Sequence, residues 1–211
     1  MTAPASSRKL QLGILGSGSG TNCQALLDAC AQPGFLAQVA VVISDVESAK
    51  ILDRARRASV EALYIAPGKF RTKLEPEVEQ RYIAALRKHN VELVCLAGFM
   101  RVIKEDFLKA FDGRIVNIHP ALLPAFPGLE SWKQALNYGA KFAGCTVHFV
   151  NSGIDTGPII LQAAVPVLDN DTAETLHARI HEQEHRIYPE AVRLIAEGRV
   201  RIEGRRVLRR E

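Results

Sequence analysis

The chain has 211 residues, of which 47% are hydrophobic and 24% charged, so one globular domain over residues 1–211 is expected. The N-terminal segment MTAPASSRKLQ lacks an apolar core as long as a signal peptide needs, and no later run approaches the ~20 apolar residues of a membrane span. We therefore expect a cytoplasmic protein with no membrane partner, in which residues 1–9 form a disordered tail.

Cysteine spacing and charge disfavour two further classes. The four cysteines show no C-x-x-C spacing, so we expect reduced packing residues rather than a disulfide framework. Much of the net charge of +4 lies in the last stretch, GRVRIEGRRVLRRE, which holds six arginines and no aromatic residue. This composition favours a solvated terminal hairpin over residues 199–211, turning at Glu203 and Gly204, over an RNA-binding arm. No nucleic-acid partner is expected, and small anionic substrates suit the charge.

Four short apolar runs in the first half are rich in β-branched residues, as the strands of a parallel sheet are. They cover residues 10–15, 39–43, 91–98 and 113–118, and helix-like segments separate them. The predicted helices run from Asn22 to Ala31, Ala49 to Ala58 and Glu75 to Asn90, each beginning near polar residues that could cap it. Right-handed β-α-β units follow. The predicted fold is α/β, with a mostly parallel Rossmann-like sheet and flanking helices.

The pattern changes after Pro120. A proline-containing stretch, HPALLPAFPG, precedes a short helix near residues 132–138, and two strand-like runs, CTVHFV and IILQAAVPV, flank NSGIDTGP. A long periodic helix follows near residues 172–196, with Leu176, Ile180 and Ile187 among its expected core contacts. The C-terminal half is therefore expected to be mixed rather than parallel.

The first predicted strand runs into a glycine-rich loop, GSGSGTN, at residues 16–22. Free backbone N–H groups and the positive dipole end of the following helix suit an anion. The loop lacks the Lys-Ser/Thr pair of a P-loop, and Thr21 stands where the dinucleotide fingerprint has its third glycine. We interpret it as a site for a single phosphate, with a ligand-free tight turn as the alternative.

The segment Arg114 to Pro120, RIVNIHP, places two polar side chains on an otherwise apolar strand. Because side chains alternate along a strand, Asn117 and His119 project from the same face, at the carboxyl end where Pro120 stops the pairing. Ligands of open α/β sheets bind at that edge. Buried polar groups without partners are costly, so these residues are either satisfied structurally or line a site, and we favour a site.

Asp155 lies in a glycine-flanked loop, where an ordinary turn aspartate is one interpretation. A chemical requirement suggests another, because acyl transfer to an amine needs donors for a tetrahedral oxyanion and a group that organises loss of the amine proton. Asn117 and a protonated His119 can donate to the oxyanion, while Asp155 can hold the imidazolium and direct proton removal. His148, on the run CTVHFV, is expected to be a supporting histidine.

Residues 181–185, HEQEH, match the H-E-x-x-H zinc motif on the last predicted helix. The spacing places His181 and His185 on one face, but His177 on the same straight helix is poorly placed to complete a tetrahedral site. The only carboxylate at a plausible distance downstream is Glu203, in the basic tail. We therefore favour a charged helix face and expect no metal.

Together these segments resemble the folate-dependent glycinamide ribonucleotide transformylases (phosphoribosylglycinamide formyltransferases) of purine biosynthesis, from about Leu10 to Gly198. GSGSGTN is similar to that family's phosphate loop and LAGFMRVI to its folate-pocket strand and turn. IVNIHPALLPAFPG resembles the catalytic strand, and GCTVHFVNSGIDTGPIILQ the segment bearing the catalytic aspartate. The resemblance implies the formyltransferase fold. It also implies transfer of the formyl group of 10-formyltetrahydrofolate to the amine of 5'-phosphoribosylglycinamide, without a metal.

The resemblance also implies roles for individual residues. The catalytic residues are Asn117, His119 and Asp155. The ribonucleotide contacts are Gly20, Thr21, Asn22 and Glu184. The pocket for 10-formyltetrahydrofolate is lined by Met100, Arg101, Val102 and Ile103, aided by Lys73 and Asn117, and its pterin ring is cradled by Asn151, Ser152, Gly153, Ile154 and Asp155.

Some positions depart from the family's pattern. Lys73 stands where an arginine is common, Ser152 and Gly153 replace acidic residues, and residues 130–132 (Glu-Ser-Trp) replace a histidine-containing stretch. Lysine keeps a positive charge for the glutamate tail of the folate but loses the bidentate fork of arginine. The pterin loop is expected to rely more on its backbone groups.

Alternatives remain at this point. Methionyl-tRNA formyltransferases and formyltetrahydrofolate hydrolases resemble the same catalytic segment, but carry an extra C-terminal or N-terminal domain that is not expected within 211 residues. A nucleotide-binding dehydrogenase with Asp45 as its ribose ligand and a zinc peptidase come from other classes. Small-molecule substrates are the only expected partners, and a monomer and a homodimer stay equally open.

Overall fold

The computed structural model describes residues 8–210, so most of the predicted N-terminal tail, residues 1–7, lies outside the described part, as does residue 211. The strands are β1 (Leu10–Leu15), β2 (Ala37–Ser44), β3 (Glu61–Tyr64), β4 (Leu93–Leu96), β5 (Ile115–His119), β6 (Phe142–Phe149), β7 (Ile159–Pro166), β8 (Val200–Glu203) and β9 (Arg206–Arg209). The helices are α1 (Thr21–Cys30), α2 (Lys50–Arg57), α3 (Pro76–Lys88), α4 (Glu105–Ala110), α5 (Ser131–Tyr138) and α6 (Ala173–Ala196).

All these strands form one sheet, in the order β3-β2-β1-β4-β5-β6-β7-β9-β8. The N-terminal half is parallel, as predicted: β1 pairs in parallel with β2 and β4, and β4 with β5. From β5 onward the sheet is mixed: β6 pairs antiparallel with both β5 and β7, whereas β7 pairs in parallel with β9. The predicted change from a parallel to a mixed arrangement after Pro120 is confirmed.

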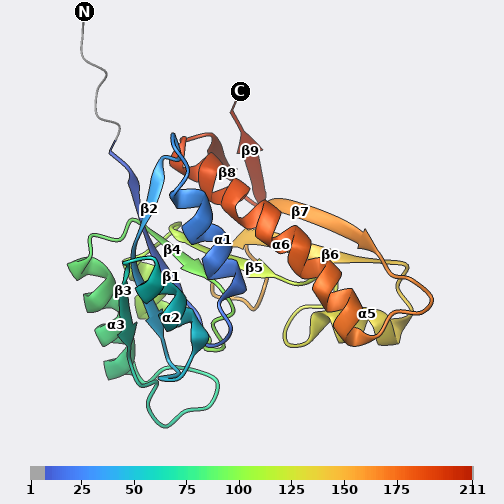
Figure 1. Ribbon diagram of the computed structural model, residues 1–211, viewed down its shortest axis with the longest axis horizontal. Coiled ribbons are helices and arrows are strands. Elements are labelled where there is room, and N and C mark those ends of the chain that lie inside the picture. The colour runs from blue at the N-terminus through green and yellow to red at the C-terminus, as the bar shows by residue number, and fades with distance from the viewer. Residues whose placement is uncertain (1–7, 211) are drawn as a thin grey trace, which may run out of the picture.

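The sheet separates two hydrophobic cores. Side chains of α1, α2, α5 and α6 pack on one face, and those of α3 and α4 pack on the other. Figure 1 shows α6 running across the sheet with α1 beside it. Near the middle of α6, the buried Tyr188 hydroxyl donates to the Leu96 carbonyl at 2.9 Å. The carboxyl ends of the central strands are thereby held against the long helix.

The predicted state of the cysteines is confirmed, because all four are free and packed inside the domain or partly so. Burial raises the pKa of the Cys23 and Cys145 thiols to about 12 and that of Cys30 to about 11. None is therefore a ready thiolate nucleophile. Among the described helices, none has the length and apolar character needed to cross a membrane.

Three local predictions were wrong or incomplete. Strand β3 and helix α4 were not predicted, because four half-exposed residues and a six-residue helix carry little periodicity. The first three helices begin without side-chain caps, at Gly20, Ala49 and Glu75. The terminal hairpin exists but turns at residues 204–205, and β9 extends the sheet by pairing with β7 at Ile159.

Candidate active site

The predicted catalytic residues meet at the carboxyl ends of the parallel strands. Asn117 and His119 occupy alternate positions of β5, and Asn117 lies between Leu96 of β4 and His148 of β6 in the strand register. Residues directly opposite each other on antiparallel strands share a face of the sheet. His148 therefore projects beside Asn117, and the amide Nδ2 of Asn117 lies 3.3 Å from its Nε2.

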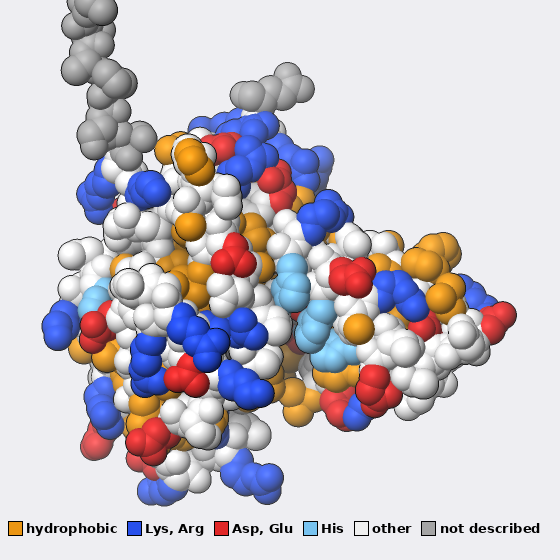
Figure 2. Space-filling view, viewed as in Figure 1, with side chains coloured by type: hydrophobic (Ala, Val, Ile, Leu, Met, Phe, Trp, Pro, Cys, Tyr) orange, Lys and Arg blue, Asp and Glu red, His pale blue; other side chains and the backbone are white. Residues whose placement is uncertain are grey.

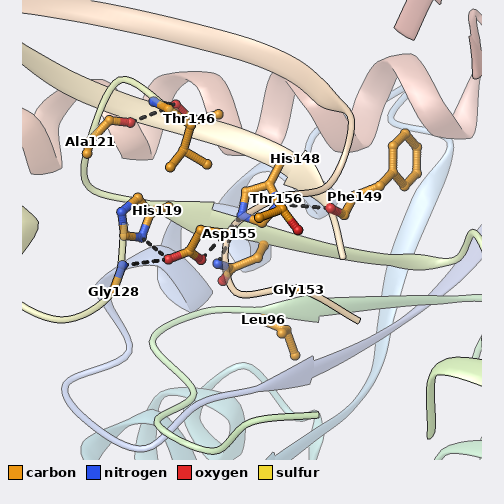
Figure 3. A network of polar contacts seen from close by, with 12 residues as sticks. Leu96, His119, Ala121, Gly128, Thr146, His148, Phe149, Gly153, Asp155 and Thr156 are labelled. Carbon is orange, nitrogen blue, oxygen red and sulfur yellow. Dashed lines mark hydrogen bonds and ion pairs between the residues drawn. The ribbon is translucent and has the colours of Figure 1, made fainter. Parts of the chain in front are cut away.

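The Asp155 carboxylate reaches this cluster from the loop between β6 and β7. Its Oδ2 lies 3.4 Å from His119 Nδ1, and its Oδ1 lies 3.8 Å from His148 Nε2. The backbone N–H of Gly128 donates to Oδ2 at 2.8 Å, and only 13% of the Asp155 side chain is exposed. Figure 3 shows the carboxylate between the two imidazoles. The structure thus brings together the three residues predicted to be catalytic.

His119 has an oxygen acceptor next to each ring nitrogen. Its Nε2 lies 3.0 Å from the Phe126 carbonyl, which can only accept a hydrogen bond, so this nitrogen carries a proton. Its Nδ1 faces the Asp155 carboxylate, and the ring is 5% exposed. An imidazolium at this position would therefore find an acceptor for both of its N–H groups.

His148 has the opposite arrangement. Its Nδ1 donates to the Phe149 carbonyl at 2.8 Å, so Nε2 of the neutral ring carries the lone pair and accepts from the Asn117 amide. Burial lowers the pKa of His148, which favours this neutral form. The structure thus specifies the supporting role predicted for His148: its ring orients the amide of Asn117.

The backbone positions of the 151–157 loop explain why it can carry Asp155 inward. A Cβ at Gly157 would lie 1.7 Å from the Phe149 carbonyl oxygen, so no larger residue fits there. Asp155 itself adopts the left-handed backbone region, with φ 52°. The side chain of Asn151 accepts hydrogen bonds from Gly153 N and from Thr156 Oγ1, which closes the loop on itself. The predicted pterin residues Ser152, Gly153 and Ile154 are left exposed.

The segment after His119 is anchored through the strand partner of that histidine. Thr146 lies opposite His119 in the β5–β6 register, and its hydroxyl donates to the Ala121 carbonyl at 2.6 Å. The same hydroxyl accepts from the backbone N–H of Leu123. Figure 3 shows this anchor beside the histidine. Thr146 thereby fixes the first residues of the proline-containing segment, which continues to Phe126 and Gly128 beside the catalytic cluster.

The glycine-rich loop connects β1 to α1, as predicted. Gly20 has φ 71°, and a Cβ on it would lie 2.7 Å from the backbone of Ile51. Glycine is therefore required here for the packing of α2, whatever the loop binds. At Gly18, by contrast, a Cβ would meet no atom within 4 Å. Arg54 of α2 supports the loop by donating to the Ser19 carbonyl at 2.8 Å.

Helices α1 and α6 bring together the predicted ribonucleotide contacts Asn22 and Glu184, with Thr21 half-buried one residue earlier. The Asn22 amide donates to Glu184 Oε2 at 2.8 Å, while its own Oδ1 is buried and has no partner. Glu184 is 2% exposed, and burial raises the pKa of its carboxyl to about 7. His181 Nε2 lies 3.5 Å from the same carboxylate. A buried carboxylate and an unpaired amide oxygen at a loop edge are acceptors suited to ligand hydroxyl groups.

The two histidines of the H-E-x-x-H stretch, His181 and His185, form a row along α6 with His177, one turn upstream. The His177 ring lies 3.6 Å from the Trp132 ring and 4.0 Å from His181, and His185 continues the row at 5.9 Å. Figure 2 shows this row in pale blue at the surface. Within residues 8–210, no three His, Cys, Asp or Glu side chains are arranged to hold a metal ion. Glu184, at a variable position of the motif, accepts from the Asn22 amide.

The residues assigned by resemblance to the folate pocket divide into two groups. Met100 and Val102 are 57% and 42% exposed and form an apolar surface next to the glycine-rich loop, where the Met100 N–H donates to Ser17 Oγ. Ile103 is 8% exposed and belongs to the hydrophobic core on the face of the sheet covered by α3 and α4. Lys73 lies next to Val102 through an isolated β-bridge, with its ammonium 4.4 Å from the Phe70 ring centroid.

The guanidinium of Arg101, also predicted to line this pocket, is occupied by structural contacts. Its Nε donates to Asp45 Oδ2 at 2.6 Å, and the Asp45 side chain is 1% exposed. Asp45 is the residue that the dehydrogenase alternative required as a ribose ligand. Because it is buried in an ion pair with Arg101, that alternative loses its main support.

Comparison with known proteins places the chain in a family. Residues 10–192 match the model of the formyl transferase family. A solved glycinamide ribonucleotide transformylase 1 from Symbiobacterium toebii superposes with a TM-score of 0.95, with 53% identity over 100% of this chain and 99% of that one. The chain belongs to the formyl transferase family.

Two curated relatives refine the comparison. Phosphoribosylglycinamide formyltransferase of Bacillus subtilis is 40% identical over 87% of this chain and 93% of its own length. The trifunctional purine biosynthetic protein adenosine-3 of Drosophila melanogaster is 44% identical over 92% of this chain, but this chain spans only 14% of its length. The similarity thus covers nearly all of one relative and a small part of a longer protein.

Sequence reasoning missed several contacts at the site. The Gly128 N–H and the Phe126 carbonyl come from the proline-containing segment, where nothing in the sequence marks a backbone group as functional. Arg54 was not singled out because a basic residue on an amphipathic helix resembles any solvated position. The partner of Asn117 could have been found, since His148 is the polar exception on a strand that is otherwise apolar or small.

We predict that Gly18→Val weakens ribonucleotide binding without unfolding the protein. The added side chain would meet no protein atom within 4 Å, so it should project into the space where a phosphate would approach the loop. KM for the ribonucleotide should rise at least about tenfold, a loss of about 1.4 kcal/mol, with KM for the folate nearly unchanged. Gly20→Val should instead lower Tm, because its Cβ strikes Ile51. Unaltered kinetics of Gly18→Val would argue for a ligand-free turn.

We also predict that Glu184→Gln stabilises the fold while it weakens ribonucleotide binding. The carboxyl binds its proton more tightly when folded, so its contribution to stability decreases as pH rises from 4.5 through about 7. At pH 8 the Glu184 carboxyl is charged, and burying it then lowers the free energy of unfolding by its full amount, roughly 3 kcal/mol. The amide should therefore raise the free energy of unfolding at pH 8 by more than at pH 5. Denaturant unfolding at both pH values tests this, with the exposed Glu182→Gln as the control.

Proposed function

We propose that the chain transfers the formyl group of 10-formyltetrahydrofolate to the amine of 5'-phosphoribosylglycinamide, giving N-formylglycinamide ribonucleotide and tetrahydrofolate in purine biosynthesis. The observation that carries this proposal is the Asp155 carboxylate held between His119 and His148, beside Asn117, in a member of the formyl transferase family. The names of relatives with 40% and 53% identity over almost their whole length support the choice of substrates.

The reaction needs stabilisation of an oxyanion. When the amine nitrogen attacks the formyl carbon, a C–N bond forms and the formyl oxygen takes up negative charge. One N–H of the Asn117 amide points to His148, which leaves the second free to donate to that oxygen. The Nε2–H of His119 is the other donor, and a charged oxygen is a stronger acceptor than the Phe126 carbonyl that it contacts now.

Proton movement completes the transfer. The attacking amine must lose a proton, and the nitrogen of the folate must gain one as its bond to the formyl carbon breaks. Asp155 is the anionic acceptor next to His119 and can take the proton directly or through water. Electrostatic stabilisation of an imidazolium at His119 is its second role. No covalent nucleophile is required, in keeping with the buried cysteines and their raised pKa values.

The two substrates would approach the reacting groups from opposite sides. The ribonucleotide phosphate is assigned to Gly20, Thr21, Asn22 and the glycine-rich loop, with Glu184 and the free Asn22 oxygen next to its ribose. The folate ring is assigned to the apolar surface of Met100 and Val102 and to the 151–155 loop. Lys73 supplies a positive charge for its glutamate tail.

The enzyme would act in the cytoplasm on these two small molecules, as a monomer or homodimer, without nucleic acid, membrane or metal. It would form one domain over residues 1–211, in which β8 and β9 of the basic terminal hairpin lie at one edge of the sheet.

The direct test is a steady-state assay of the purified protein with both proposed substrates. Loss of the formyl donor and formation of N-formylglycinamide ribonucleotide in equal amounts are expected, with no effect of a chelator. Consumption of the donor at the same rate without the ribonucleotide would instead indicate a formyl-folate hydrolase.

Within this reaction, we predict that Asp155→Asn lowers kcat at least about a hundredfold with modest changes in KM. The substitution keeps the shape of the side chain and an acceptor for Gly128 N–H, but it removes the charge beside His119. Asp169→Asn, at a largely exposed carboxylate on the surface, is the control. If Asp155→Asn retained near-native kcat, Asp155 would be the ordinary turn residue and the mechanism would be wrong.

A further inference from the structure

A second buried ion pair lies outside the catalytic cluster and plays no part in the proposed chemistry. Asp45 directly follows β2, and its carboxylate accepts from Arg101 Nε at 2.6 Å. The side chains of Asp45 and Arg101 are 1% and 15% exposed. The second oxygen of Asp45, Oδ1, is buried without a partner. Such a carboxylate is costly to bury, so a role in shaping the neighbouring segments would explain its presence.

The guanidinium of Arg101 joins two segments that are remote in the sequence. Its Nη1 donates to the Phe70 carbonyl at 2.8 Å and also contacts the Arg71 carbonyl. Next to it, the Val102 N–H donates to the Thr72 carbonyl at 2.8 Å. Segments 66–74 and 98–103 are thus held together by the side chain of one arginine and a short backbone pairing.

The joined segments carry the surface assigned to the formyl donor. Met100 and Val102 are exposed on one segment, and Lys73 lies on the other beside Val102. Without the Asp45 carboxylate, the Arg101 guanidinium would be a buried charge with no anionic partner. Solvation would then favour a conformation in which it turns outward to water. The Phe70 and Arg71 carbonyls would then lose their donor, and the two segments could separate.

We propose that Asp45 is a positioning residue for the formyl donor: through Arg101 it fixes segments 66–74 and 98–103 in the shape that binds the ring and the glutamate tail of the folate. This proposal rests on the proposed function, because it takes formyl-folate as the ligand of that surface. Asp45 itself touches neither substrate, so its effect should fall on donor affinity and not on the rate of the chemical step.

The test compares Asp45→Asn with a matched ion-pair variant. In Asp45→Asn the side chain keeps its size and loses its charge, so KM for the formyl donor should rise about tenfold, while kcat and KM for the ribonucleotide change less than about twofold. The dissociation constant of tetrahydrofolate, measured by calorimetry, should rise by the same factor as KM for the donor. Asp45→Glu, which keeps the charge, should restore part of the affinity.

The matched control is Asp171→Asn. Asp171 forms a similarly buried pair with Arg179 at 2.8 Å, at the start of α6 and away from both segments. This variant should lower Tm as Asp45→Asn does, but leave both KM values unchanged. The proposal is overturned if Asp45→Asn leaves donor affinity unaltered, or if it raises both KM values equally.

Failure of the proposed function would look different. A wild-type protein that binds tetrahydrofolate but transfers no formyl group to 5'-phosphoribosylglycinamide would contradict the function. The tetrahydrofolate dissociation constants of Asp45→Asn and Asp171→Asn would still decide the role of Asp45.

Discussion

The placement of one carboxylate determines what the rest of the site can do. Asp155 is drawn between His119 and His148 by the Gly128 N–H and by a loop whose last turn has room for no side chain at Gly157. The two imidazoles are positioned by the antiparallel pairing of β5 with β6, the point at which the sheet stops being parallel. The change of strand direction after Pro120 is therefore the structural basis of the site.

Around this carboxylate the two proposed substrate sites are mechanically connected. Segment 98–103 is tied at one end to the glycine-rich loop, since Ser17 N donates to the Gly98 carbonyl and Met100 N donates to Ser17 Oγ. At its other end, Arg101 ties it to Asp45 and to segment 66–74. The loop assigned to the ribonucleotide phosphate and the surface assigned to the folate are thus joined directly by the hydrogen bonds of Ser17. Close packing of such segments allows small shifts to be transmitted.

The sequence predicted well the elements whose apolar and polar side chains follow a regular period. The central strands are apolar runs in the sequence. The alternation of side chains along β5 placed Asn117 and His119 on one face, at the carboxyl end of the strand. Short elements such as β3 lacked a period long enough to detect, and the missing caps of α1 to α3 reflect tertiary packing, as at Gly20 against Ile51. His119 and Asp155 each contact a backbone group of the segment after Pro120, the Phe126 carbonyl and the Gly128 N–H. A linear sequence does not specify such contacts.

A double-mutant cycle on kcat measures whether His119 and Asp155 act as one unit in the transfer. His119→Ala, Asp155→Asn and the double variant would be compared with the wild type, after circular dichroism has shown that all four are folded. We expect the double variant to be little worse than the poorer single variant, because each substitution already disables the pair. Losses that multiply across the two substitutions would show that His119 and Asp155 act independently, and the paired mechanism would then be wrong.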